Sequence, residues 1–236
     1  MCRALAWLLA LVALAGQAQT LTLHYQERPP YSSTSPDGPV TGLVATPALA
    51  ALRQAGIDFR LAVTPSQRQL ALIQSGKGLH CGMGWFRTPE REALGQFSRP
   101  LYRDQPLGAL VRTRTGLASG SSAAALLADT RFSLLVKDGY SYGPTLDALL
   151  ARAAAPVERT SVDPPQMSLM LRSGRADWMI VAPEEAAVLG AQGLQLVTFT
   201  DVPSGLTRHL YCGNDVPADW MARIDRALPD LAPPAR

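Results

Sequence analysis

The stretch from Thr46 to Arg91 reads TPALAALRQAGIDFRLAVTPSQRQLALIQSGKGLHCGMGWFRTPER, and it decides the fold class. Two apolar helical segments, which end at Gly56 and Gly76, alternate with the extended segments Ile57–Val63 and Leu79–Met83. A Thr-Pro pair precedes each of three predicted helices, where threonine is a good N-cap and proline fits the first helical position. The pattern predicts a β-α-β-α-β unit and therefore a parallel sheet with crossover helices.

The alternation continues on both sides of this stretch. Leu21–Tyr25 predicts the first strand, Leu107–Val111 predicts another, and the small polar residues 112–122 predict a loop. A second α/β unit follows, with strands expected at 132–136, 177–181, 194–199 and 206–211 and helices at 144–153, 166–172, 183–189 and 217–228. The fold class is therefore predicted to be α/β, built from two units.

Length and composition already exclude several classes of protein. The chain has 236 residues, which suits one or two domains. Only 17 % of its residues are charged, which argues against a charged disordered protein. The formal net charge is +3 with no concentrated basic segment, which argues against a nucleic-acid partner.

Residues 1–18 have the features of a signal peptide. A short positive start, Met1–Arg3, precedes the apolar run Ala4–Ala15, and Gly16-Gln17-Ala18 suits a cleavage site. The run of 12 residues is shorter than the roughly 20 that span a membrane. We expect a mature chain that begins near Gln19 in the periplasm; an uncleaved anchor or a buried helix are the alternatives.

Export leaves two of the three cysteines. Cys2 leaves with the signal peptide, and Cys81 and Cys212 remain. In an oxidising compartment two cysteines suggest one disulfide, and two buried free thiols are the alternative.

The segment Thr88-Pro89-Glu90-Arg91 suggests an anion site. A helix N-terminus presents free N–H groups and partial positive charge, and a guanidinium donates two parallel hydrogen bonds to a carboxylate. The alternative is a surface ion pair of Arg91 with Glu90, Glu92 or a distant acid.

Several motifs in order resemble one family. Thr88-Pro89-Glu90-Arg91 and Phe97-Ser98-Arg99-Pro100-Leu101-Tyr102 are similar to its T-x-x-R and F-S-x-P-Y motifs, and Gly174-Arg175-Ala176-Asp177 to its G-R-x-D. Pro29-Pro30-Tyr31 and Pro65-Ser66-Gln67-Arg68 resemble its opening loop and a helix start. The resemblance is to bacterial solute-binding proteins of family 3, which bind polar amino acids, and covers residues 19–230.

The resemblance implies a two-lobed periplasmic-binding-protein-like (type II) fold that closes around a ligand. Lobe 1 would comprise residues 19–110 and 203–236, and lobe 2 residues 111–202, with hinge strands near Leu107–Val111 and Val197–Pro203. The family implies a monomer that delivers a small-molecule ligand to an ABC permease or a membrane sensor. No enzymatic activity and no cofactor are expected.

The resemblance also assigns roles around the cleft. Arg91 would bind the ligand's carboxylate with help from Thr88 and the helix N-terminus. The remaining candidate ligand-binding residues are Tyr31, Trp85 and Phe86 from lobe 1 and Tyr140 and Ser141 from lobe 2, although each aromatic residue could instead serve packing.

Some positions depart from the pattern of amino-acid binders. Ala182 stands where the family commonly places an acid for the ligand's ammonium, and Glu184 and Glu185 follow slightly later. We therefore expect a small polar ligand with an anionic group, an amino acid or a small carboxylate. The sequence around Cys81 and Cys212 resembles an uncharacterised branch with paired cysteines.

A rival hypothesis is an enzyme. Gly139-Tyr140-Ser141-Tyr142-Gly143 is a literal G-x-S-x-G between a predicted strand and helix, as in a hydrolase nucleophile elbow. Asp177 or Asp201 and then His209 follow in the order of a hydrolase triad. A plain strand-to-helix turn and a dehydratase on this fold are further alternatives.

Metal and dinucleotide sites are not expected. His24, His80 and His209 have no metal-ligand spacing, and the cysteines form no C-x-x-C motif. Gly82-Met83-Gly84 lacks the third glycine of a dinucleotide-binding loop.

Overall fold

The computed structural model describes residues 19–36, 38–190, 192–202 and 205–231. The predicted signal peptide, residues 1–18, lies outside this range. No helix in the described part of the chain is both long and apolar enough to cross a membrane.

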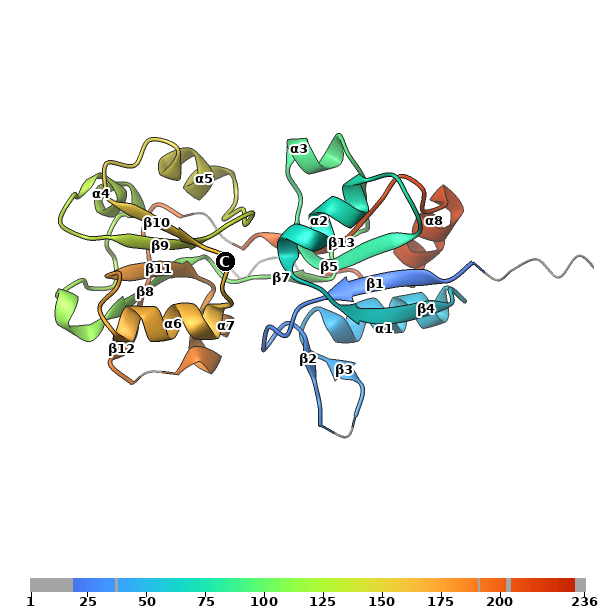
Figure 1. Ribbon diagram of the computed structural model, residues 1–236, viewed down its shortest axis with the longest axis horizontal. Coiled ribbons are helices and arrows are strands. Elements are labelled where there is room, and N and C mark those ends of the chain that lie inside the picture. Colours follow the sequence, from blue (N-terminus) through green and yellow to red (C-terminus); the bar gives the residue numbers. More distant parts are fainter. Residues whose placement is uncertain (1–18, 37, 191, 203–204, 232–236) are drawn as a thin grey trace, which may run out of the picture.

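Two sheets lie side by side, each with its own helices (Figure 1). The first sheet has the order β4-β1-β5-β13-β6, with β7 paired to β13. Its strands are β1 (Leu21–Tyr25), β4 (Phe59–Val63), β5 (His80–Phe86), β6 (Gln96–Phe97), β7 (Tyr102–Arg103) and β13 (Thr207–Cys212). Helices α1 (Ala45–Gln54), α2 (Ser66–Gln74), α3 (Pro89–Glu92) and α8 (Ala218–Ala227) and the hairpin of β2 (Ser33–Thr34) and β3 (Val40–Thr41) complete this lobe.

The second sheet has the order β10-β9-β11-β8-β12. Its strands are β8 (Gly108–Arg112), β9 (Leu134–Lys137), β10 (Val157–Thr160), β11 (Trp178–Val181) and β12 (Leu194–Val197). Its helices are α4 (Ala123–Ala128), α5 (Pro144–Leu150), α6 (Pro164–Arg172) and α7 (Pro183–Leu189), with a 3-10 turn at Thr113–Thr115. The α/β class and the two-lobed fold are therefore confirmed.

The chain crosses between the sheets twice, before β8 and after β12. All of β8 pairs within the second sheet, with β11 and β12, so the predicted division at 110/111 falls inside a strand of that sheet. The predicted hinge strand Leu107–Val111 thus belongs mostly to lobe 2. The second predicted hinge, Val197–Pro203, ends at a residue outside the described range.

The predicted parallel unit is present. β1 pairs in parallel with both β4 and β5, and α1 and α2 make the crossovers. The Thr-Pro reasoning is correct only at Thr88, whose hydroxyl accepts from the Arg91 N–H. The N-caps of α1 and α2 are Val44 and Pro65, which have no capping side chain.

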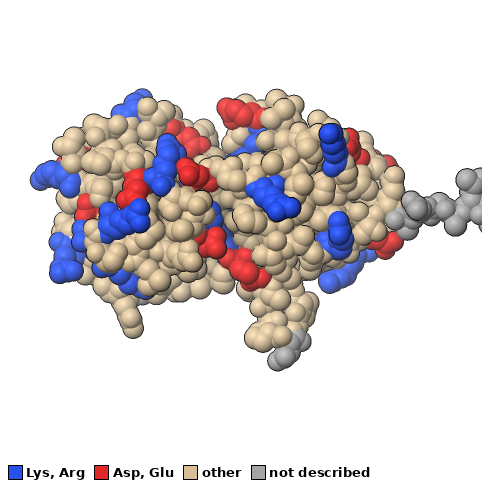
Figure 2. Space-filling view, viewed as in Figure 1, with Lys and Arg blue, Asp and Glu red and all other residues tan. Residues whose placement is uncertain are grey.

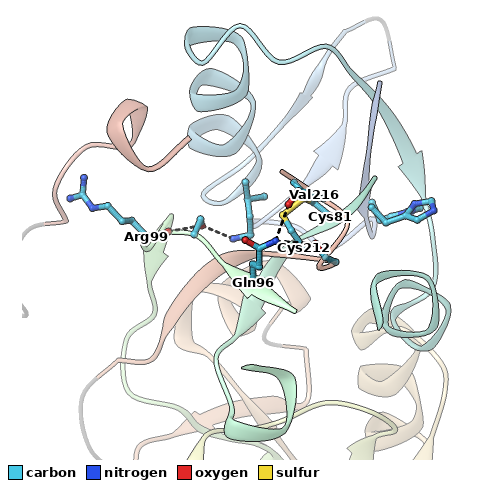
Figure 3. The surroundings of a disulfide bond; sticks show 10 residues. Cys81, Gln96, Arg99, Cys212 and Val216 are labelled. Atoms are coloured by element: carbon cyan, nitrogen blue, oxygen red, sulfur yellow. Dashed lines mark hydrogen bonds between the residues drawn. A yellow bond between two sulfur atoms is a disulfide. The ribbon is translucent and has the colours of Figure 1, made fainter. Parts of the chain in front are cut away.

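The predicted cysteine pair is a disulfide. Cys81 on β5 and Cys212 on β13 are register partners in an antiparallel pair, with Cα atoms 4.0 Å apart. Gln96 of β6 lies beside the bridge and donates to the carbonyl of Val216, as Figure 3 shows. The bridge therefore joins two central strands of the first sheet, and the free-thiol alternative is wrong.

The surface has no single-sign face in the view of Figure 2, where acidic and basic side chains are interspersed over both lobes.

Candidate functional site

A cavity of about 70 Å³ lies between the two lobes. This is several times the roughly 10–15 Å³ that one ordered water requires. Lobe 1 lines it with Gln26, Arg28, Tyr31, Ser32, Val44, Ser66, Gln69, Met83, Gly84, Trp85, Phe86, Arg91 and Arg208. Leu107 lines it from the crossover before β8, and lobe 2 contributes Tyr140, Ser141, Tyr142, Ile180, Val181, Ala182 and Glu185.

Six of the seven predicted ligand-binding residues line this cavity. They are Tyr31, Trp85, Phe86, Arg91, Tyr140 and Ser141. The exception is Thr88, which does not line the cavity; its hydroxyl caps α3 by accepting from the Arg91 backbone N–H and so helps to position Arg91.

The first turn of α3 already carries two acidic residues of the chain itself, Glu90 and Glu92. Pro89 has no N–H, and the Arg91 N–H donates to the Thr88 hydroxyl. The pKa of the exposed Glu90 carboxyl is lowered by its proximity to its own backbone N–H and to Thr88. The expected contribution of this helix end to an anion site therefore stays a prediction, and the guanidinium of Arg91 is the group that lines the cavity.

Arg91 is a buried cation that forms no salt bridge with any described residue; the nearby acids Asp147 and Glu90 act on it only through their charge. Its side chain donates from Nη1 to the Phe86 carbonyl at 2.8 Å and from Nη2 to the Gly139 carbonyl of lobe 2 at 3.2 Å. The residue is 8 % exposed, its guanidinium lies 4.8 Å from the centre of the Trp85 ring, and burial lowers its pKa. Glu92 pairs instead with Arg87, so the surface-ion-pair reading of Arg91 is wrong.

A second buried arginine, Arg208 of β13, lies on the same wall and is fully paired. Its Nε and Nη2 atoms donate to the two oxygens of Asp104, each at 2.7 Å. Its guanidinium lies 3.8 Å from the centre of the Tyr31 ring and 4.7 Å from that of Phe86. The pair thus fixes the two aromatic side chains that wall this part of the cavity.

Tyr31 brings an unused hydroxyl to the cavity. Its Oη atom is buried and has no hydrogen-bond partner in the described structure. Burial raises the pKa of Tyr31, so the phenol keeps its proton at neutral pH. A buried donor without a partner is costly, and a ligand oxygen would satisfy it.

An ion pair joins the lobes across the cavity. Arg28 of lobe 1 donates from Nε and Nη2 to the two oxygens of Glu185 on α7, at 2.6 and 2.8 Å. Its guanidinium lies between Tyr31 and Tyr140, 5.2 and 4.9 Å from their ring centres. Glu185 is 2 % exposed and makes both hydrogen bonds to this one partner.

Other contacts also cross between the lobes. Glu184, next to Glu185 on α7, accepts from the Tyr102 hydroxyl and the Gln105 N–H. The Tyr140 hydroxyl lies 2.8 Å from Gln26 Oε1. Gly139 has a φ of 72°, and a Cβ at that position would collide with Gln67 of α2. The lobes are therefore closed directly onto one another.

The serine of the G-x-S-x-G segment is not hydrogen-bonded to a histidine. Ser141 donates to Asp147 of α5. Both ring nitrogens of His209 are engaged, by the Ser98 carbonyl and the Thr207 hydroxyl. The candidate acids are engaged elsewhere: Asp177 by Arg112 and Ser133, and Asp201 by Ser122 and the first N–H groups of α4. No hydrolase triad is assembled from these residues.

Sequence reasoning missed four charged residues at the site. Arg28, Asp104, Glu185 and Arg208 were not assigned to it, and three of them line the cavity. One signal was available, because Arg208 is a charged residue in a predicted strand, and such residues are rarely buried without a partner. The partner itself, 104 positions away, carried no signal.

Comparison with known proteins identifies the fold. No family model and no curated protein sequence matches the chain. Among solved structures, an ancestral arginine-binding protein bound to glutamine is 20 % identical, with 88 % of this chain and 89 % of that chain covered and a TM-score of 0.71. This chain has the fold of the amino acid-binding proteins.

Two further structures give the same result. An ancestral amino acid-binding protein, a precursor of cyclohexadienyl dehydratase, is 20 % identical, with 88 % of this chain and 87 % of that chain covered and a TM-score of 0.69. The substrate binding protein of an amino acid ABC transporter is 15 % identical, with 88 % and 91 % covered and a TM-score of 0.69. At these identities the likeness establishes the two-lobed fold.

Proposed function

We propose that this protein is an exported solute-binding protein. It captures a small polar ligand with an anionic group in the cavity between the lobes. An ABC-type permease or a membrane sensor then recognises the loaded, closed form. The substrate binding protein of an amino acid ABC transporter, which shares the fold, supports this role.

The observation that carries the proposal is Arg91. A guanidinium keeps its charge when buried, and burying it without an acidic partner is unfavourable. Two of its five N–H groups donate to carbonyls, one on each lobe, and the others remain to bind a ligand anion. A ligand carboxylate would complete the site and favour closure.

The disulfide supports export. Disulfides persist in oxidising compartments and are rare in the cytosol, and Cys81–Cys212 joins two central strands. We propose the periplasm as the location, with a monomer as the binding unit. A binding role is favoured over a catalytic one because Ser141 has only a carboxylate, Asp147, beside its hydroxyl.

The test is a thermal-shift screen of residues 19–236 against small carboxylates and amino acids. A ligand at 100 times its Kd stabilises the folded state by about 2.7 kcal/mol, which is roughly 5–11 °C for a chain of this size. Arg91→Met should weaken the best hit by about 30-fold or more, since it removes a buried charged hydrogen-bond donor.

Arg131→Ala is the matched control, because Arg131 is an exposed arginine of lobe 2 paired only with Asp129. It should leave the affinity unchanged. A hit whose affinity survives Arg91→Met would overturn the anion site, and the absence of any hit would overturn the function.

A further inference from the structure

The charges around the cavity are strongly unbalanced. Three arginines line it, Arg28, Arg91 and Arg208, and Glu185 is the one acid among the described lining residues. Both oxygens of Glu185 accept from Arg28. Asp104, behind Arg208, is held in the same bidentate way. No carboxylate at the described cavity is therefore left to receive a ligand cation.

The aromatic walls are also occupied on their cation-binding faces. Aromatic rings in a binding site commonly hold a ligand cation over the ring face. Here guanidinium groups already take that position: Arg91 at Trp85, Arg208 at Tyr31 and Phe86, and Arg28 at Tyr140. An ammonium group brought to these rings would meet a like charge.

Two side-chain amides at the cavity are used internally as well. Gln26 Oε1 lies in a hydrogen bond with the Tyr140 hydroxyl, and Gln69 Oε1 accepts from Trp85 Nε1 at 3.1 Å. The Phe86 and Gly139 carbonyls accept from Arg91. The groups with spare capacity include the Arg91 guanidinium, which can only donate, and the Tyr31 hydroxyl, which has no partner and can donate to a ligand oxygen.

From this arrangement we infer that the ligand is a carboxylate without an ammonium group, of which the 2-oxo acids are the simplest probes. The inference rests on the proposed function and names the ligand class within it. Arg91 receives the carboxylate, and the Tyr31 hydroxyl donates to a further oxygen of the ligand. An α-amino acid presents the same carboxylate but also buries a cation that meets arginines and no unpaired carboxylate.

The test is calorimetric titration of residues 19–236 with matched pairs that differ at one carbon. The pairs are pyruvate and alanine, 2-oxoglutarate and glutamate, and phenylpyruvate and phenylalanine, with arginine as a cationic probe. At least one 2-oxo acid should bind about 100-fold or more tightly than its amino acid, since an unpaired buried charge is heavily penalised. Arginine should give no heat of binding.

Two variants should weaken the proposed discrimination against ligands that carry an ammonium group. Arg28→Gln frees the Glu185 carboxylate, and Ala182→Asp adds an acid at a cavity-lining position that is also the N-cap of α7, where aspartate is well tolerated. Each variant should reduce the ratio of the 2-oxo acid's affinity to the amino acid's affinity by about 10-fold or more, chiefly because the amino acid binds more tightly. Arg131→Gln, on the exposed surface of lobe 2, should leave the ratio unchanged.

The outcomes separate this inference from the function beneath it. An amino acid that binds as tightly as its 2-oxo partner, or more tightly, overturns the ligand class and leaves the solute-binding function standing. If neither variant changes the affinity ratio of the paired ligands, the role assigned to the three arginines in rejecting an ammonium group is wrong. A protein that binds neither class loses the proposed function, and the inference falls with it.

Discussion

The two lobes bring different kinds of groups to the cavity between them. Lobe 1 supplies the arginines and most of the aromatic wall, and lobe 2 supplies a backbone carbonyl, Tyr140, Ser141 and Glu185. Two of the three arginines of lobe 1 are held within that lobe: Arg208 by Asp104 and Arg91 by the Phe86 carbonyl. The third, Arg28, pairs across the cavity with Glu185 of lobe 2, whose two oxygens both accept from it.

This difference assigns the lobes different parts in binding. A preassembled surface recognises a ligand with little loss of conformational entropy, whereas a surface whose contacts form only on closure responds to the ligand. Lobe 1 is therefore expected to recognise the anion, and lobe 2 is expected to close onto lobe 1 when the anion binds. The disulfide lies in the sheet of lobe 1 and adds to its rigidity.

Removing the disulfide should have the largest effect on this contrast. Cys81 and Cys212 are 131 positions apart, and the chain-entropy model gives about 5 kcal/mol for a loop of this length, as an upper figure. The double variant Cys81→Ser, Cys212→Ser should lose stability in urea unfolding, and hydrogen exchange should quicken first in β5 and β13. Equal loss of protection in β9 and β11 would mean that the lobes unfold as one unit.

Replacing Asp104 should have the next largest effect. Asp104→Asn leaves Arg208 buried without an acid, which costs about 3–5 kcal/mol in comparable buried pairs. The matched change in lobe 2, Glu185→Gln, should cost less, because opening the cleft lets water reach Arg28, whose side chain is already 18 % exposed. Urea unfolding of both variants measures the difference. Equal costs would show that the interlobe pair is as essential to the fold as the pair in lobe 1.

Acid should weaken lobe 1 by a smaller amount. All three histidines, His24, His80 and His209, lie on strands of its sheet, and each has a lowered pKa because it is buried. Burial and the neighbouring His80 lower the pKa of His24 to about 4. The unfolded chain therefore takes up the proton near pH 6.5 and the folded chain only near pH 4, so stability falls as the pH falls through that window.

The expected loss from His24 between pH 7 and pH 5 is about 2 kcal/mol. Urea unfolding at the two pH values measures it, and His24→Gln should reduce the pH dependence. Hydrogen exchange at pH 5 should quicken in β1 and β5 more than in β9. A loss that is the same in wild type and His24→Gln would assign the acid sensitivity to other groups.

Much of the fold was predictable because local sequence patterns determine where its strands and helices lie. Leu21–Tyr25 and Pro183–Leu189 match their elements at both ends, since alternation and a proline at a helix start act over a few residues. β10 and α4 were missed: Val157–Thr160 is short and mostly polar, and α4 lies in an alanine-rich run without periodicity. The strands β6 and β7, two residues each, exist only because β13 is beside them.

The sequence by itself determined the alternation of strands and helices, the cysteine pair and the choice of Arg91. Each rests on residue type or on spacing within one segment. Only the tertiary structure decided that Arg91 is a buried cation, because a surface ion pair and a buried cation look the same in sequence. It also decided the cavity's charge: Arg28 and Glu185 are 157 positions apart, and Arg208 and Asp104 are 104 apart. Coulomb forces act through space, and only the packing of the two lobes brings these groups together.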